Sequence, residues 1–302
     1  MTTERPPTID PLAAARWQRL PLSDSPWLHE EVARRMEERL AWIMRQPQNW
    51  VHWEPQRGGL QAQALLQRRY PGSECFLALS PEEIAQGAIK KIAKPWWHPA
   101  RWRGGLRYGA VPPRGAAQML WANMALHMAA DPQALLARWH EALAVDGFLM
   151  FSCLGPDTLR ELRALYQVLG WPAPSHEFTD MHDWGDMLVQ AGFAEPVMDM
   201  ERIELTFETP QRLLQELREL GRNLHPQRFP GLRGRGWRER LHQALQQLAD
   251  PAQDGRLKLT FEIIYGHAFK PQPRIPVAAE TALSLEEMRQ TLRQRKPKEP
   301  GL

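Results

Sequence analysis

Apolar residues recur every three or four positions along several stretches of the chain, a period that is typical of amphipathic helices. The clearest stretch is residues 27–46, where apolar residues from Leu28 to Ile43 are separated by Glu and Arg. Ser80 and Glu83 have the spacing of a capping box, which predicts a further helix start. Similar patterns or start signals predict helices over residues 11–19, 59–69, 131–143, 156–169 and 179–191.

Short apolar runs between turn residues predict buried strands. They cover residues 49–53, 74–79, 118–124 and 148–154, and two longer extended segments follow at 198–207 and 258–269. Strands that alternate with helices favour a doubly wound α/β sheet, with the last two strands paired antiparallel at one edge. In such a sheet, ligands bind beyond the carboxyl ends of the strands.

The pattern also suggests how the chain is divided. Residues 1–26 are polar and contain several prolines, so we interpret them as an N-terminal arm. Residues 27–271 hold all the predicted strands. Within them, residues 209–252 form a helical, arginine-rich insertion that is expected to cover the ligand edge as a lid. Residues 272–302 are a charged tail. The segment WWHPARW at 96–102 is either an aromatic platform for a ligand or a hydrophobic lid on the sheet.

The composition excludes several classes of protein. Hydrophobic residues make up 43% of the chain and charged residues 24%, which is typical of globular domains and not of disordered chains. Cys75 and Cys153 lie in apolar runs, which favours buried thiols in a reducing compartment over a disulfide. The first residues show no apolar signal sequence, and the most apolar window, residues 115–130, is too short and too polar to span a bilayer. We therefore expect a cytoplasmic protein without a membrane segment.

The sequence HEFTDMHDWGD at 176–186 allows two interpretations. Histidine and aspartate at this density are able to ligate a metal ion. Alternatively, the segment begins a helix, with Thr179 or Asp180 as the N-cap and further acidic residues in the first turn. The second interpretation is favoured, so no metal site is expected.

The formal net charge is only +3, but the positive charges are unevenly distributed. Residues 211–240 contain eight arginines and three glutamates. Such a run forms a solvated helix face, a docking patch for an acidic partner or a surface for nucleic acid. Only Phe229 and Trp237 lie among the arginines, too few for base stacking, so nucleic acid is not an expected partner.

Several segments resemble class I S-adenosylmethionine-dependent methyltransferases. Residues 121–127, WANMALH, are similar to the fourth-strand segment of that family, and residues 145–152, VDGFLMFS, to its fifth strand. A narrower resemblance, to the malonyl-[acyl-carrier protein] O-methyltransferases of biotin synthesis, lies in FSCLGPDTLREL at 151–162, LRELGRN at 217–223 and LTFEIIYGH at 259–267. The resemblance extends from about residue 27 to about residue 271.

This resemblance implies a Rossmann-like, mostly parallel seven-stranded sheet and S-adenosyl-L-methionine as the cofactor. It also implies a substrate, a malonyl group carried by acyl carrier protein, whose free carboxylate becomes methylated. A carboxylate has a pKa of about 4 and is therefore already a nucleophile at neutral pH. The reaction needs positioning and exclusion of water rather than a general base, so no catalytic residue is predicted.

The resemblance further implies that the cofactor site includes the segment after the first strand. There the family has an acidic residue followed by Gly-x-Gly-x-Gly, whereas this chain has His52 at the acidic position and Glu54, Gln56 and Gly58 at the glycine positions. Ala78 stands where the family has an acidic residue for the ribose hydroxyls. The predicted cofactor-binding residues are His52, Glu54, Gly58, Gly59, Ala78, Leu79 and Asn123.

Two functions are compatible with this pattern. The first is an S-adenosylmethionine-dependent methyltransferase, and the second is a non-catalytic relative that binds acyl carrier protein or another acidic partner. Both use the arginines of the insertion as a docking patch for the acidic carrier protein. The predicted partner-binding residues are Arg222, Arg233, Arg235, Arg238 and Arg240.

Overall fold

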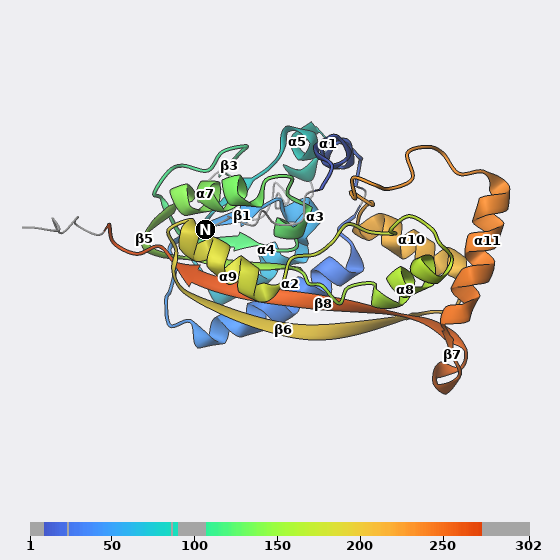
Figure 1. Ribbon diagram of the computed structural model, residues 1–302. Helices are drawn as coiled ribbons and strands as arrows, with labels where there is room; N and C mark the ends of the chain where they lie inside the picture. The colour runs from blue at the N-terminus through green and yellow to red at the C-terminus, as the bar shows by residue number, and fades with distance from the viewer. Residues whose placement is uncertain (1–8, 23, 86, 90–106, 274–302) are drawn as a thin grey trace, which may run out of the picture. The chain divides into compact units, whose positions relative to one another are not determined.

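The structure is a computed structural model that describes residues 9–22, 24–85, 87–89 and 107–273 (Figure 1). The described residues up to Pro271 form one compact unit. The aromatic segment at 96–102 and the charged tail beyond residue 273 lie outside the described residues.

One mixed sheet forms the centre of the fold (Figure 1). Its strands are β1 (Asn49–Trp53), β2 (Glu74–Ala78), β3 (Arg107–Gly109), β4 (Ala117–Ala122), β5 (Leu143–Leu154), β6 (Ala194–Phe207) and β8 (Arg256–Phe269), with the two-residue β7 (Ala249–Asp250) beside β8. The order is β3-β2-β1-β4-β5-β8-β6. Strands β1 to β5 are parallel, whereas β8 runs antiparallel to both β5 and β6. This confirms the doubly wound sheet and the antiparallel pairing of the last two long strands, and it places the reversed strand between β5 and β6.

Helices cover both faces of the sheet because alternate strand residues point to opposite sides. On one face, Trp50 and Phe148 belong to a core that includes residues from five of the described helices. On the other face, Val51 and Leu149 belong to a core that includes residues from two of them. The helices of the first face are α2 (Trp27–Arg39), α4 (Gln61–Arg69), α8 (Arg160–Val168), α10 (Pro210–Leu220) and α11 (Arg235–Leu245), and those of the second are α7 (Pro132–Ala142) and α9 (Met181–Gln190). A short α5 (Pro81–Ala85) follows β2, and the predicted capping box is present between Ser80 and Glu83.

The helix predicted from residue 156 begins instead at Arg160. The turn before it is fastened to β8, because the N–H of Gly155 donates to the carbonyl of Glu262 at 2.9 Å and that of Leu159 to the carbonyl of Thr260 at 2.7 Å. These bonds hold the turn at the carboxyl end of β5, where a ligand would bind.

Two other helices are shorter than predicted. The helix expected over residues 27–46 ends at Arg39 and is followed by one 3-10 turn, Leu40–Trp42. The helix expected from residue 59 begins at Gln61, because Gly59 has a φ of 115°, outside the helical region. The residues before it form a separate helical turn, α3 (Pro55–Gly58).

The N-terminal arm is tied to the arginine-rich insertion. Asp10 caps α1 (Pro11–Gln18), and its backbone N–H donates to the carbonyl of Leu224 at 2.8 Å. The Asp10 carboxylate also pairs with Arg228 at 2.6 Å. Ala14 and Met128 are buried in a cluster with Leu224 beneath this contact. The arm and the insertion therefore cover the carboxyl edge of the sheet together.

The close packing of the turn after β1 leads to a prediction on stability. A Cβ added to Gly58 would lie 2.8 Å from the carbonyl oxygen of Asn123, so Gly58→Ala should lower the free energy of unfolding by about 1–3 kcal/mol. Gly185, inside α9, has open space around it, and Gly185→Ala should raise the free energy of unfolding by about 0.5–1 kcal/mol. Urea unfolding measures both changes, and equal effects of the two substitutions would contradict the placement of Gly58.

Candidate active site

The chain leaves β1 in a conformation that normally requires glycine. Glu54 has a φ of 44° and a ψ of 57°, in the left-handed region. A side chain in such a conformation costs about 1–3 kcal/mol. The backbone therefore has a glycine-like geometry at the first of the three expected glycine positions, although the residue there is glutamate.

The N-terminal arm closes over the next part of this turn. The side-chain amide of Gln56, fully buried, donates to the carbonyl of Leu22, and Ser25 Oγ donates to the carbonyl of Gln56 at 2.9 Å. The Arg57 guanidinium donates to main-chain carbonyls at the end of α1, including that of Gln18 at 2.7 Å. The second glycine position thus holds a buried side chain that binds the arm.

Asn123, directly after β4, fastens three segments to each other. Its side-chain amide donates to the carbonyl of His29 in α2 at 2.8 Å and to the carbonyl of Gly58, while Ser152 Oγ donates to its side-chain oxygen at 2.6 Å. Because its side chain is buried and occupied by these protein groups, we interpret Asn123 as a residue that positions the turn after β1.

A first cavity of about 250 Å³ lies beyond the ends of β1 and β4. The residues of its wall include Trp17, Trp53, Glu54 and Asp131. Two guanidinium groups stack on these indoles: Arg57 lies 4.1 Å from the ring centroid of Trp17, and Arg138 lies 4.8 Å from that of Trp53. The cavity therefore combines aromatic surface with both signs of charge.

A second cavity, of about 220 Å³, lies beyond the ends of β4 and β5 beneath α10. Its wall is mainly apolar and includes Leu154, Leu162, Phe178, Leu214, Leu217 and Phe261. Arg218, Arg222 and Asn223 supply polar groups to the same wall. Met128 contributes to the walls of both cavities, so the two spaces are neighbours at this side chain.

Four histidines are buried in this part of the protein, and two of them, His127 and His176, line the second cavity. Burial lowers the pKa of all four. The pKa of His29, His52 and His176 falls to about 4 in each case, and that of His127 also lies well below its usual value. These four imidazoles are consequently neutral at pH 7. They are able to donate or accept hydrogen bonds, but they bring no positive charge to the site.

Of the predicted cofactor-binding residues, only Glu54 and Asn123 line the first cavity. His52 lies beneath the turn, with Nδ1 at 2.9 Å from Gln63 Oε1. Gly58 packs on Asn123, and Gly59 packs on Glu30. Ala78 and Leu79 are buried in apolar clusters.

Sequence reasoning missed other residues at this edge. Trp17 and Asp131 line the first cavity but come from α1 and the N-cap of α7, far from β1 in sequence. The buried carboxyl of Glu83 lies near the end of β2, where its Oε2 accepts from the N–H of Ser80 at 2.9 Å. Burial, followed by the nearby Glu54 carboxylate, raises the pKa of Glu83 to about 8. A helix N-cap before a proline is a sequence signal that could have indicated Asp131.

The predicted arginine patch separates into three environments. Arg222 lines the second cavity. Arg233 stacks on the rings of Phe229 and Trp237, at 4.2 and 4.1 Å from their centroids. Three members are exposed on α11: Arg235, Arg238 and Arg240.

The histidine- and aspartate-rich segment is also divided. His176 is buried, whereas Asp180 caps α9 and accepts from the N–H of His182 at 2.8 Å. Among the described residues, no group of three or more His, Cys, Asp or Glu side chains is arranged to hold a metal ion. Within the same residues, no helix has the length and apolar character needed to cross a membrane.

The lowered histidine pKa values predict that acid destabilises the fold. The pKa of His52 is about 4 in the folded state against 6.5 for an unperturbed histidine, so the unfolded chain binds the proton first as the pH falls. From about pH 7.5 to about pH 4.5, His52 should account for a loss of about 2–3 kcal/mol in the free energy of unfolding. In urea unfolding, the free energy of unfolding of His52→Gln should fall by about 2–3 kcal/mol less than that of the parent over this pH range. An unchanged pH dependence in His52→Gln would contradict the assignment.

Comparison with known proteins identifies the family. No protein-family model matches the chain. The malonyl-[acyl-carrier protein] O-methyltransferase of Gallionella capsiferriformans is 38% identical over 265 residues, which cover 82% of this chain and 86% of the relative. The enzyme of the same name from Laribacter hongkongensis is 37% identical over 257 residues, 82% of this chain and 84% of the relative. The crystal structure of the YcgJ protein of Bacillus subtilis shares the fold, with a TM-score of 0.50 at 13% identity over 80% of this chain and 99% of that one. The chain therefore belongs to the malonyl-[acyl-carrier protein] O-methyltransferase family.

Proposed function

We propose that the protein is an S-adenosylmethionine-dependent enzyme that methylates the free carboxylate of a malonyl group on acyl carrier protein, a step of biotin synthesis in the cytoplasm. The observation that carries this proposal is the pair of cavities that meet at Met128, beyond the carboxyl ends of β1, β4 and β5. A mainly apolar space beside a space that is both charged and aromatic provides separate places for an acyl group and for a nucleoside. The names of the relatives support the same reaction.

The residues of the first cavity fit the cofactor chemically. Trp17, which is less buried than Trp53, offers aromatic surface for an adenine ring, and Glu54 and Asp131 are the acidic residues of the wall that suit ribose hydroxyls or an ammonium group. When bound, S-adenosylmethionine supplies a methyl group on a sulfonium, and transfer of this group to a carboxylate oxygen leaves a methyl ester and S-adenosylhomocysteine. Glu54 thereby takes the role of the acidic residue that is absent at Ala78.

The residues of the second cavity position the acceptor rather than activate it. The malonyl carboxylate is ionised at neutral pH and needs no base. The apolar wall formed by Leu154, Leu162 and Phe261 excludes water from that carboxylate, which strengthens its attraction to a neighbouring positive charge. Met128, at the boundary of the two cavities, limits how the two reactants approach each other.

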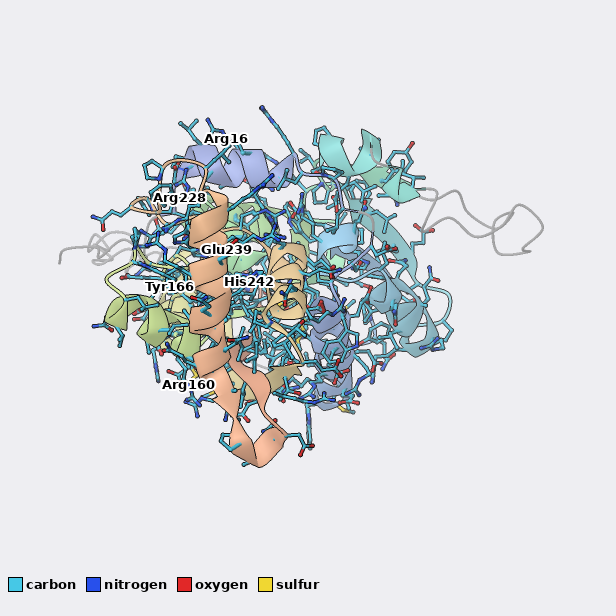
Figure 2. All side chains as sticks on the ribbon, turned by 90° about the vertical axis from the view of Figure 1, so that its right-hand side faces the viewer. Arg16, Arg160, Tyr166, Arg228, Glu239 and His242 are labelled. Atoms are coloured by element: carbon cyan, nitrogen blue, oxygen red, sulfur yellow. The ribbon has the colours of Figure 1, made fainter. Side chains whose placement is uncertain are left out.

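The exposed face of α11 is the proposed docking surface for the acidic carrier protein. Figure 2 shows this face, on which Glu239 and His242 of α11 are labelled and Tyr166 and Arg160 mark the neighbouring helix α8. Within α11, Glu239 is the only acidic residue among the exposed arginines. The three exposed arginines give α11 a net positive charge, which speeds encounter with an acidic partner.

A second function, carrier binding without catalysis, is favoured by one observation. The buried Gln56 side chain and the arm residue Leu22 occupy the side of the turn where the family has its middle glycine. A chain that had lost the cofactor would still keep the second cavity and the face of α11. The two functions differ in one measurable property, methyl transfer.

Methyl transfer distinguishes the two functions directly. The purified protein with S-adenosylmethionine should convert malonyl-carrier protein into its methyl ester, which intact-protein mass spectrometry detects as a gain of one methylene mass. Acetyl-carrier protein, which lacks the free carboxylate, is the matched control and should not change. Carrier binding without any methyl ester would exclude the enzyme and support the second function.

The proposed role of Glu54 predicts a loss of cofactor affinity on removal of its carboxylate. Glu54→Gly relieves the left-handed backbone and at the same time removes a charged hydrogen bond, so binding of S-adenosylhomocysteine should weaken by about 1.5–3 kcal/mol. Glu195→Gly is the matched control, because Glu195 also has a positive φ, of 52°, and lies in β6. Calorimetric titration measures both affinities. Tighter binding by Glu54→Gly would show that the glutamate obstructs the cofactor instead.

The docking surface predicts a charge-dependent association. Replacing Arg235, Arg238 and Arg240 together with Glu should weaken binding of acyl carrier protein at low salt by at least about tenfold, or 1.4 kcal/mol. The fold should persist, because exposed charges contribute little to stability. Surface plasmon resonance over a range of salt concentrations measures the effect, and parent-like association of the triple variant would remove α11 from the interface.

A further inference from the structure

The second cavity contains two buried polar atoms that lack partners among the described residues. They are Ser175 Oγ and His176 Nδ1, on side chains that are 8% and 4% exposed. Both residues belong to the cavity wall, which is otherwise mainly apolar. Because buried polar groups in folded proteins are nearly always paired, these two atoms indicate an occupant that carries hydrogen-bonding groups of its own.

The hydrogen bond of His176 defines what that occupant must offer. His176 Nε2 lies 3.1 Å from the carbonyl oxygen of His127, and because a carbonyl only accepts, Nε2 carries the proton. The neutral ring therefore presents Nδ1 as an acceptor. The neighbouring Ser175 hydroxyl is able to donate. The pair matches a ligand with both an N–H and a carbonyl, and thus an amide, and it does not match a plain alkyl chain.

Two arginines supply positive charge at the same cavity. Arg218 and Arg222 lie at the end of α10, and Arg222 Nη1 donates to the carbonyl of Gly221 at 2.7 Å, which holds its guanidinium there. Among the described residues, no carboxylate forms an ion pair with either arginine. Burial and the nearby charges of Arg218 and Arg57 lower the pKa of Arg222. This accumulation of unneutralised charge favours an anion, and a guanidinium is well suited to phosphate.

We propose that the second cavity binds a phosphopantetheine thioester, with its phosphate at Arg218 and Arg222 and an amide of the arm at Ser175 and His176. The aliphatic parts of the arm contact the apolar wall, and the acyl end lies toward Met128. The assignment rests on the proposed function, in which a carrier-bound substrate brings this arm to the site. It extends that function by naming the residues of this chain that recognise the arm.

The same arm occurs on acyl carrier protein and in coenzyme A, so the test begins with the arm alone. Calorimetric titration compares malonyl-phosphopantetheine with malonyl-pantetheine, which lacks the phosphate. In the parent, loss of the phosphate should weaken binding at least about tenfold. In Arg218→Gln/Arg222→Gln, the two ligands should bind with affinities that differ by less than about threefold. Arg212→Gln, on the same helix but outside the cavity wall, is the control and should keep the parent's difference.

A second variant tests the amide contact. Ser175→Ala should weaken binding of both pantetheine ligands by about three- to tenfold and leave binding of octanoate unchanged. If octanoate competes with malonyl-phosphopantetheine at equal affinity, the assignment is wrong and the cavity is a fatty-acyl site. The assignment is also wrong if the parent binds malonyl-phosphopantetheine and malonyl-pantetheine with equal affinity. Malonyl-coenzyme A and malonyl-carrier protein then distinguish the source, since only the carrier should depend in addition on Arg238 of α11.

These outcomes are separate from those of the proposed function. If the protein methylates malonyl-carrier protein but binds the ligands with and without the phosphate equally well, the proposed function stands and this assignment is wrong. If the protein binds the arm through Arg218 and Arg222 but forms no methyl ester, the assignment of the second cavity stands and the proposed methyltransferase activity is wrong.

Discussion

The rest of the site depends on the hydrogen bonds of the Asn123 side chain. Its amide binds the carbonyls of His29 and Gly58, and its oxygen accepts from Ser152. In this way one buried residue connects α2, the turn after β1 and β5 at the carboxyl edge of the sheet. Residue 58 also lies so close to the main-chain carbonyl of Asn123 that a Cβ would be 2.8 Å from its oxygen, which accounts for a glycine at this position.

The N-terminal arm and the arginine-rich insertion, which are distant in sequence, together cover the carboxyl edge of the sheet. The arm bonds to the turn after β1 through Gln56 and Arg57, and to the insertion through Asp10. The contact between Gly221 and Met128, where a Cβ would lie 3.3 Å from the methionine Cε, brings the insertion onto the boundary between the cavities. The arm and the insertion thus form one side of both proposed ligand sites, and the carboxyl ends of the strands form the other.

Local patterns were sufficient to predict most of the fold. The bounds of β1 were predicted to the residue, and the Asp180 cap of α9 was one of two proposed, because strand periodicity and capping depend on neighbours in sequence. The turn before Arg160 was not predicted, since its bonds go to β8, about a hundred residues later. Sheet contacts of that range leave no local signal.

The candidate site was predicted less completely than the fold. Alignment with the family's glycine motif placed the turn after β1 at the ligand edge, but it could not show that Gln56 is buried against the arm or that Trp17 lines the first cavity. His176 was grouped with exposed acidic residues because they are adjacent in sequence, whereas in the fold it lies beside His127 at the second cavity. Side-chain direction at these positions is decided by tertiary packing.

Nuclear magnetic resonance of the protein with ¹³C-labelled methionine methyl groups tests most directly whether two ligands meet at Met128. The Met128 signal, assigned by its loss in Met128→Leu, should shift on saturation with S-adenosylhomocysteine alone and also with malonyl-phosphopantetheine alone. The signal of Met44, which is 90% exposed, should remain unchanged. A Met128 signal that responds to only one bound ligand, or to neither, would contradict the account.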